Sequence, residues 1–306
     1  MKLLDQARQI LRVKHFALRT EQCYLRWIEQ YIRFHKTPDG WRHPRDLGAP
    51  EVEQFLGHLA LERRVSASTQ NQALAALLFL YRDVLRLDLG PLDAARARRT
   101  RRLPVVLSRD EVRQLLDALD RLPTTEPYAL MARLMYGAGL RLMECCRLRV
   151  KDVDLVRNQL TVRQGKGDKD RVVMLPQAAR AGVEAQLAWR AAVHARDLER
   201  GLGWVSLPDA LPVKYPAAPT ALGWQFLFAS RCLSRDPRSD NVGRHHLHES
   251  RVHLAVTTAV RSLGWTKRAT CPVTRCGTVS PPTCWRWTTT SAPCRNCSAT
   301  PTSAPP

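Results

Sequence analysis

Two short stretches carry residue types suited to chemistry on a phosphate. The first is YGAGLRLME (136–144), in which Arg141 follows a glycine turn and opens a helix. A guanidinium in this place points in front of the helix, and its planar fork can bind two oxygens of one phosphate. Glu144, three residues on, can lie on the same helical face and hold the arginine. Taken locally, the pattern fits a simple Arg–Glu surface pair equally well.

The second stretch is GKGDKDR (165–171), which contains Lys166 and Lys169. Apolar and polar residues alternate on both sides of this Gly/Asp-rich turn, so the sequence predicts a β-hairpin from Gln159 to Leu175. A lysine at a hairpin tip can reach a nucleic-acid backbone and could supply a proton to a leaving alkoxide. A solvated turn without function is the alternative.

The part of the chain before these two stretches is predicted to be helical. Residues 1–90 show apolar stripes at helical spacing, and Thr20 with the following glutamate predicts the start of a second helix. Ser66 and Ser68 offer N-caps for a fourth helix over about residues 70–87. We therefore expect a small four-helix unit.

After Pro104 the pattern becomes mixed. Ser108 and Glu111 form a capping box in front of one apolar helical face. Residues 201–228 are rich in Pro and Trp, and they are predicted to be irregular. The expected fold is α+β, mainly α, with a small hairpin sheet and further helices at 127–138, 141–148, 177–200 and 249–263.

An arginine-rich run follows the helix-breaking pair Gly90-Pro91. Five arginines fall within seven positions, namely Arg96, Arg98, Arg99, Arg101 and Arg102. Without counter-anions these charges repel one another, so we expect a linker that also lies on phosphates; a solvated linker is the alternative. The formal charge of +20 over 306 residues favours nucleic acid over a membrane surface as the partner.

Two other classes of protein are disfavoured. No stretch reaches the roughly 18 apolar residues of a membrane-spanning helix. The N-terminus carries a base and an acid within five residues, Lys2 and Asp5, and shows no apolar core of a secretory signal. We expect a cytoplasmic protein, with its cysteines present as reduced thiols.

In this order and spacing, the stretches resemble the tyrosine recombinase family. That family combines a helical DNA-clamping domain, a basic linker and a catalytic domain with G-x-G-x-R-x-x-E and GKG-x-K-x-R motifs. The resemblance covers about residues 1–271. Within the family the chain is most similar to integron integrases, in RTEQCYLRWIEQYIRFH (19–35), QALAALLFLYRDVL (72–85) and RLPVVLSRDEV (102–112). It also shares their insert LPDALPVKYP (207–216), with DPRS (236–239) and RHH (244–246).

The resemblance implies an organisation and a function. A core-binding, SAM-like clamp would span 1–90, a linker 91–104, and the catalytic domain 105–271 with an insert at about 201–229. The implied activity is site-specific recombination that inserts and excises gene cassettes, without metal or nucleotide cofactor. The implied partners are double-stranded and folded single-stranded attachment-site DNA and further copies of the chain.

The resemblance also implies roles for single residues. Arg141 would activate the phosphate, Lys166 would protonate the leaving 5′ oxygen, and Glu144 would be a structural partner. Lys169, Arg171 and Trp224 are expected to contact DNA. Five aromatic residues would stack on extrahelical bases, or alternatively form a small core under the insert: Trp204, Tyr215, Trp224, Phe226 and Phe228.

The chain departs from the family pattern near its end. The family also needs an H-x-x-R pair, a late His or Trp and a tyrosine nucleophile, but the last tyrosine here is Tyr215 and the last histidine is His253. Residues 272–306 contain no Leu, Ile, Asp, Glu, Lys, His or Tyr. We expect this tail to be disordered and the chain to be unable to cleave DNA.

A frameshift near codon 272 would explain the departure. Back-translating residues 274–286 with GC-rich codons, and starting at the third base of the first codon, gives TLRHSFATHLLE. A preceding histidine codon then restores H-T-L-R-H, and the same shift through residue 306 can give a string that contains the family's late G-H. We therefore expect an integron integrase whose last part is out of frame.

Other functions stay open. A non-catalytic protein could occupy attachment sites and regulate recombination. A basic zinc protein could use the five cysteines from Cys271 onwards, although the composition of residues 272–306 suits an out-of-frame tail better. The histidines at 245, 246, 248 and 253 lack a Cys or acidic partner at metal-ligand spacing. Lastly, a catalytic domain without its final helices could fail to fold, because apolar surface from residues 130–150 and 252–263 would be exposed.

Overall fold

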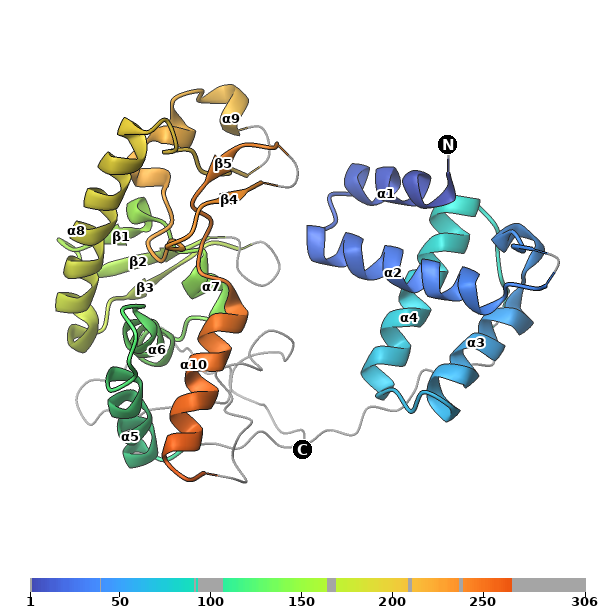
Figure 1. The fold of residues 1–306 in the computed structure, drawn as a ribbon, viewed down its shortest axis with the longest axis horizontal. Helices are drawn as coiled ribbons and strands as arrows, with labels where there is room; N and C mark the ends of the chain where they lie inside the picture. The colour runs from blue at the N-terminus through green and yellow to red at the C-terminus, as the bar shows by residue number, and fades with distance from the viewer. Residues whose placement is uncertain are drawn as a thin grey trace, which may run out of the picture. The chain divides into compact units, whose positions relative to one another are not determined.

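Four α-helices enclose one apolar core in the first ninety residues (Figure 1). The computed structural model describes residues 2–38, 40–90, 92, 107–163, 169–208, 211–236 and 239–265. The chain divides into two units, residues 1–103 and 104–306, and each is considered by itself. The helices of the first unit are α1 (Leu3–Val13), α2 (Leu18–Phe34), α3 (Ala49–Leu61) and α4 (Ala67–Phe79), and a π-helix over Leu80–Leu85 continues the last.

The predicted ends of two of these helices are only partly right. Of the two predicted N-caps, Ser66 caps α4, accepting a hydrogen bond from Thr69 N at 3.3 Å, whereas Ser68 lies inside the helix. The α-helix ends at Phe79 instead of near residue 87. The predicted start of α2 at Thr20 is wrong. Ala17 O already accepts the amide hydrogen of Thr20 at 2.8 Å, so the helix begins at Leu18.

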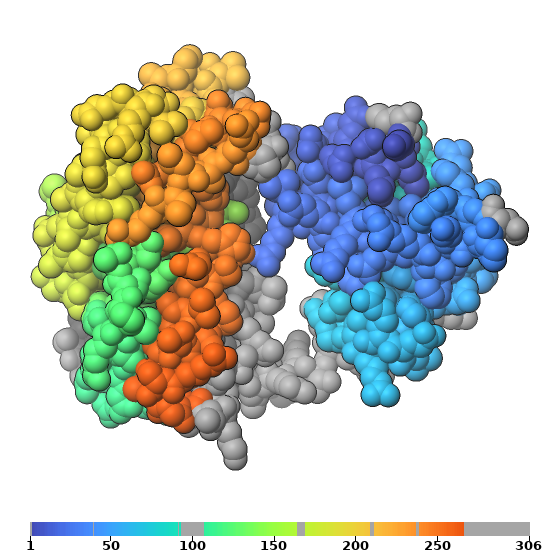
Figure 2. Space-filling model, viewed as in Figure 1, coloured from blue at the N-terminus to red at the C-terminus, as the bar shows by residue number. Residues whose placement is uncertain are grey.

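The second unit is mixed, as predicted, and its described helices pack mainly on one another beside a small sheet (Figure 1). Ser108 and Glu111 form the predicted capping box, with Glu111 N donating to Ser108 Oγ at 3.2 Å. In Figure 2, α5 and α10 lie side by side on one face of the unit, and the two helices are in contact. The described helices are α5 (Arg109–Asp120), α6 (Tyr128–Gly137), α7 (Leu142–Cys146), α8 (Gln177–Glu199), α9 (Leu211–Lys214) and α10 (Glu249–Ser262).

Helix α10 buries most of its apolar side chains. Its inward face joins the main core of the unit, whereas Leu254 is 55% exposed. The exposed apolar surface expected for residues 252–263 is therefore confined mainly to Leu254 in the described structure. The buried apolar residues of this helix are Val252, Ala255, Val256, Ala259 and Val260.

The predicted hairpin is confirmed within a slightly larger sheet. Strand β2 (Gln159–Val162) pairs antiparallel with β3 (Arg171–Met174), with Val162 opposite Arg171. The short strand β1 (Val153–Asp154), which the sequence pattern did not predict, adds on the other side of β2. A second small hairpin joins β4 (Ser234–Arg235) and β5 (Val242–Gly243). Residues 164–168, predicted to form the turn of this hairpin, lie outside the described residues.

Buried polar side chains of α8 contact both the predicted insert, residues 201–229, and Arg244 beyond it. Asp197 on α8 accepts two hydrogen bonds from Arg244, at 2.6 Å (Nε–Oδ2) and 2.9 Å (Nη2–Oδ1). Nη1 of Arg190, a residue only 1% exposed, lies 3.9 Å from the same carboxylate. Arg190 also donates to Gln225 Oε1 at 2.8 Å, and Gln225 donates to two backbone oxygens of the insert. Burial lowers the pKa of Arg190 to about 10.

The end of the insert pairs with the chain just after α7. Val150 N donates to Gln225 O at 3.0 Å, and Arg149 and Phe226 form an isolated antiparallel bridge. The Arg149 guanidinium donates to Trp224 O and lies 4.5 Å from the centroid of the Phe226 ring. The insert therefore contacts the backbone that leads directly out of α7.

Within the part of the chain that the structure describes, none of the helices combines the length and the hydropathy needed to cross a membrane.

Candidate active site

The glycine turn between α6 and α7 sets the direction of Arg141. Helix α6 ends at Gly137, and Gly139 adopts φ +63°, a left-handed conformation that glycine adopts at little cost. Arg141 then has extended dihedral angles and is the N-cap of α7. Its amide donates to Glu144 Oε2 at 2.8 Å, so the carboxylate closes the first turn of a helix only five residues long.

Glu144 joins Arg141 to the hairpin. Nη1 of Arg141 lies 2.5 Å from Glu144 Oε1, which confirms the predicted pair. Arg171 at the start of β3 donates both terminal nitrogens to the same carboxylate, at 2.9 and 2.6 Å. The Glu144 side chain is 7% exposed, against 24% for Arg141 and 35% for Arg171. One buried carboxylate thus holds two arginines that lie nearer the surface.

The electrostatics of this group keep Glu144 ionised. Burial alone would raise the pKa of Glu144, but the hydrogen bonds from Arg171 and Arg141 outweigh it and lower the pKa to about 2. Nε and Nη2 of Arg141 make no hydrogen bond to the described residues. The guanidinium is therefore held on one side and can bind an anion on the other.

The other predicted site residues are only partly described. Lys166 and the linker arginines at 96, 98, 99, 101 and 102 lie outside the described residues, as do the cysteines from 271 onwards and the tail. Lys169 is exposed. Arg171 is predicted to contact DNA, and in the structure both of its terminal nitrogens donate hydrogen bonds to Glu144.

The insert aromatics do not behave as one group. Phe226 (5% exposed) and Phe228 (0% exposed) are buried, so the expectation that they are available for base stacking is wrong. Phe226 belongs to a small core under the insert, with Trp224 packed against it, which is the alternative arrangement. Tyr215 is 50% exposed, and Trp204 and Trp224 are half-buried.

The sequence reasoning missed a cationic cluster beside Trp224. Lys151 Nζ lies 2.8 Å from the centroid of the Trp224 ring, and the pKa of Lys151 is lowered to about 8 by burial and by the charge of Arg163. Asp152, 3% exposed, accepts a hydrogen bond from Arg163 Nε at 2.6 Å. The residues VKD at 150–152 show no periodicity that predicts the burial of Asp152 or the contact of the exposed Lys151 with Trp224, so only the tertiary structure shows this cluster.

Metal-binding groups are not brought together in the described parts of either unit. Among those residues, no three His, Cys, Asp or Glu side chains are grouped so that they could hold a metal ion. His246 is buried, and burial together with neighbouring His245 lowers its pKa to about 4. Cys145 and Cys146 are buried thiols without a disulfide partner.

Comparison with known sequences covers both units. Residues 3–90 match the model of the phage integrase N-terminal SAM-like domain, and residues 105–276 match that of the phage integrase family. Proteins named integrase/recombinase from Escherichia coli and Pseudomonas aeruginosa are 46% identical over 271 residues, which is 88% of this chain and 78% of each relative. Tyrosine recombinase XerA of Thermococcus kodakarensis is 38% identical over 148 residues, 47% of this chain and 50% of the relative.

Two solved structures share the fold. XerH recombinase bound to its difH substrate in a pre-cleavage complex matches with a TM-score of 0.56 at 15% identity, over 87% of this chain and 70% of that one. A lambda integrase tetramer bound to a Holliday junction matches with a TM-score of 0.51 at 18% identity, over 86% of this chain and 65% of that one. The arginine held at a glycine turn, the two matched domains and the extent of the sequence identity agree, and the chain belongs to the phage integrase family of tyrosine recombinases, which carry out site-specific DNA recombination.

Proposed function

We propose that this chain binds recombination sites of the integron type, where a complete enzyme would insert and excise gene cassettes. The observation that carries the proposal is the Arg141–Glu144–Arg171 group, which fixes one guanidinium and leaves part of it able to bind a phosphate. The predicted insert at 201–229, in which Gln225 and Thr220 are hydrogen-bonded to side chains of α8, supports the integron lineage. The DNA ligands in the XerH and lambda integrase structures support DNA as the partner and several copies of the chain on it.

Each site residue has a proposed role in that reaction. Arg141 would offset charge that builds on the phosphate oxygens, and Glu144 with Arg171 would hold it in place. Lys166 would donate its proton to the 5′ oxygen as the bond from that oxygen to phosphorus breaks. Lys169 and Trp224 would contact the DNA outside the reacting phosphate. No metal or nucleotide cofactor is part of this proposal, and its setting is the bacterial cytoplasm.

We infer that the chain itself does not cleave DNA. In the family reaction a tyrosine oxygen attacks phosphorus and forms a phosphotyrosine bond while the 5′ oxygen leaves. No tyrosine follows Tyr215 and no histidine follows His253, and the match to the family model stops at residue 276. A frameshift near codon 272, which would put residues 272–306 out of frame, is part of the same inference.

The proposed loss of cleavage predicts a clear result. A nicked attachment-site DNA incubated with the full chain should yield no covalent protein–DNA adduct on a denaturing gel. The same sample should show bound DNA on a native gel, which controls for folding. An adduct would contradict the inference. Sequencing the gene from codon 265 to about 150 bases past codon 306 tests the cause independently, because a shifted frame should run on to a tyrosine codon.

A second candidate function is a non-catalytic DNA-binding protein that occupies attachment sites and blocks or regulates recombination. The missing late tyrosine favours it, and so does the charge of +20. In cells that contain an active recombinase of this family, the chain should then lower the recombination frequency. An unchanged frequency would count against regulation but not against DNA binding.

The linker gives a separate prediction about DNA binding. Changing Arg98 and Arg101 to alanine should weaken binding to all sequences alike, because these arginines are proposed to neutralise phosphates. The slope of log K against log salt should flatten by about 1 unit for each lost contact. Fluorescence anisotropy across a salt series measures it, and an unchanged slope would show that the linker does not touch the DNA backbone.

A further inference from the structure

The loop between α2 and α3 presents a tryptophan to solvent. Trp41 is 60% exposed, and among the tryptophans in the described ranges it is the one with more than a third of its surface exposed. Trp41 lies outside the short sequence motifs that carry the resemblance to the tyrosine recombinase family. An exposed indole of this kind has no role in the core of the first unit, so its surface is available to a partner.

The loop backbone around Trp41 is held at both ends. Thr37 and Gly40 exchange two backbone hydrogen bonds, at 3.0 and 3.1 Å, directly before the tryptophan. After it, His43 Nδ1 caps a short 3-10 turn, and Leu47 O accepts a hydrogen bond from the buried Tyr81 hydroxyl at 3.0 Å. The indole is thus carried by a constrained loop, which reduces the entropy lost when a ligand binds.

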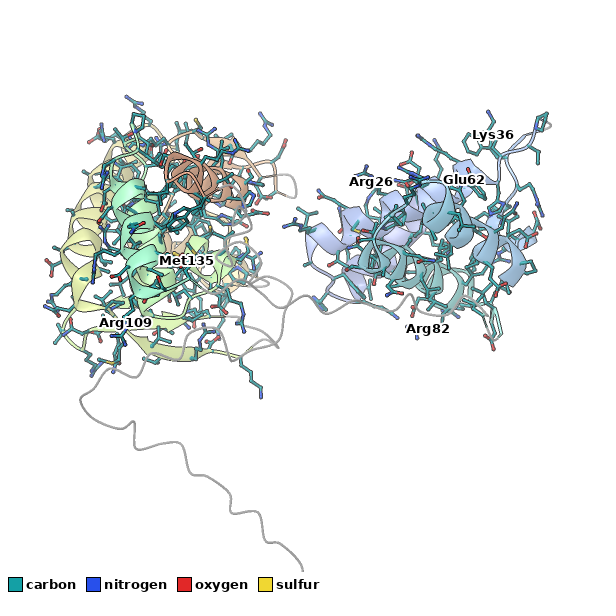
Figure 3. The ribbon with its side chains drawn as sticks, turned by 90° about the horizontal axis from the view of Figure 1, so that it is seen from below. Arg26, Lys36, Glu62, Arg82, Arg109 and Met135 are labelled. Atoms are coloured by element: carbon teal, nitrogen blue, oxygen red, sulfur yellow. The ribbon has the colours of Figure 1, made fainter. Side chains whose placement is uncertain are left out.

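One cation lies beside the exposed ring, and another follows four residues later in the chain. Lys36 Nζ lies 5.1 Å from the Trp41 centroid, and Figure 3 shows Lys36 at one end of the first unit, well apart from Arg26 and Arg82. Arg45 is exposed and has no acidic partner among the described residues. Arg42, by contrast, is used inside the loop, where it lies 3.5 Å from Glu51.

We propose that Trp41, with Lys36 and Arg45, is a binding site for an unpaired nucleotide. The base would stack on the indole, and its flanking phosphates would meet the two cations. Aromatic rings next to cations bind single-stranded nucleic acid in this way, because each base has a π face and each nucleotide a negative charge. The proposal rests on the DNA binding proposed above and adds a contact in the first unit, separate from the arginine site of the second.

The test compares unpaired and paired DNA. Binding of the full chain to a labelled oligothymidylate of about 20 nucleotides, and to a duplex of the same length, is measured by fluorescence anisotropy. Trp41→Ala should weaken binding to the oligothymidylate about tenfold and binding to the duplex less than about twofold. Trp41→Phe, which keeps an aromatic face, should retain most of the affinity. Leu61→Ala, at another exposed apolar residue of the same unit, should change neither.

The outcomes separate this inference from the proposed function. Wild-type affinity of Trp41→Ala for the oligothymidylate, with duplex binding intact, overturns the tryptophan site alone. An equal loss on both DNAs also overturns it, since a stacking site for unpaired bases must discriminate between them. If the wild-type chain binds neither DNA, the proposed function fails and the inference fails with it. Circular dichroism of each variant confirms that the fold is retained.

Discussion

Replacing Asp197 with asparagine should lower the free energy of unfolding of the second unit by about 3–5 kcal/mol. The carboxylate is 3% exposed, accepts two hydrogen bonds from Arg244 and lies 3.9 Å from the buried Arg190. Without its charge, two guanidiniums remain close together with no anion between them. Urea denaturation read by pulsed hydrogen exchange measures the effect, because peptides from the two units are distinguished.

A matched control is present on the same helix. Glu199 is exposed near the end of α8, and Glu199→Gln should change stability by less than about 0.5 kcal/mol. Adding Arg190→Met to Asp197→Asn should recover part of the loss, because one uncompensated charge is removed. A loss below about 1 kcal/mol in Asp197→Asn would show that the carboxylate does not compensate the arginines.

The second large effect should follow Glu144 and depend on pH. Its pKa is lowered from 4.5 to about 2 in the folded chain, and at about 1.4 kcal/mol per pKa unit the ionised group contributes about 3 kcal/mol of stability. Because the folded pKa is the lower one, this contribution is complete above about pH 4.5 and is lost as the pH falls towards 2. Glu144→Gln should remove it at pH 7 and leave a smaller loss of stability on acidification.

The difference between wild type and Glu144→Gln isolates this carboxyl group from the other acids of the chain. Urea titrations at pH 7 and at pH 3 should show the two proteins far apart at the first pH and closer at the second. Glu184→Gln is the control, since Glu184 pairs with Arg180 while 47% exposed, and surface pairs contribute less than about 1 kcal/mol. Parallel pH curves for wild type and Glu144→Gln would refute a stabilising role for the ionised group.

Local sequence patterns predicted the parts of the site that are close along the chain. Gly139, Arg141 and Glu144 lie within six residues, so the turn, the helix start and the i,i+3 pair could all be inferred from spacing. The partnership of Glu144 with Arg171 could not, because the two residues are 27 positions apart and meet only after the hairpin has paired.

The burial of charged side chains could not be predicted from the sequence either. Arg149, Arg190 and Asp197 have the residue types of a solvated surface, yet each is at most 9% exposed. Hydropathy patterns assign such residues to the outside, since burial is favourable only with partners that the tertiary structure provides. The same reasoning explains Phe226 and Phe228, whose burial depends on the path of an insert without regular periodicity.

The pairing of the insert with the segment after α7 also dictates an order of assembly. Arg149 and its acceptor Trp224 O are 75 residues apart, so the contact closes a long loop and requires much of the second unit to be in place. A five-residue helix such as α7 is not stable alone in water. During synthesis, the first unit can fold from contacts within its own residues, whereas the arginine site can become rigid only after the chain beyond residue 228 has left the ribosome.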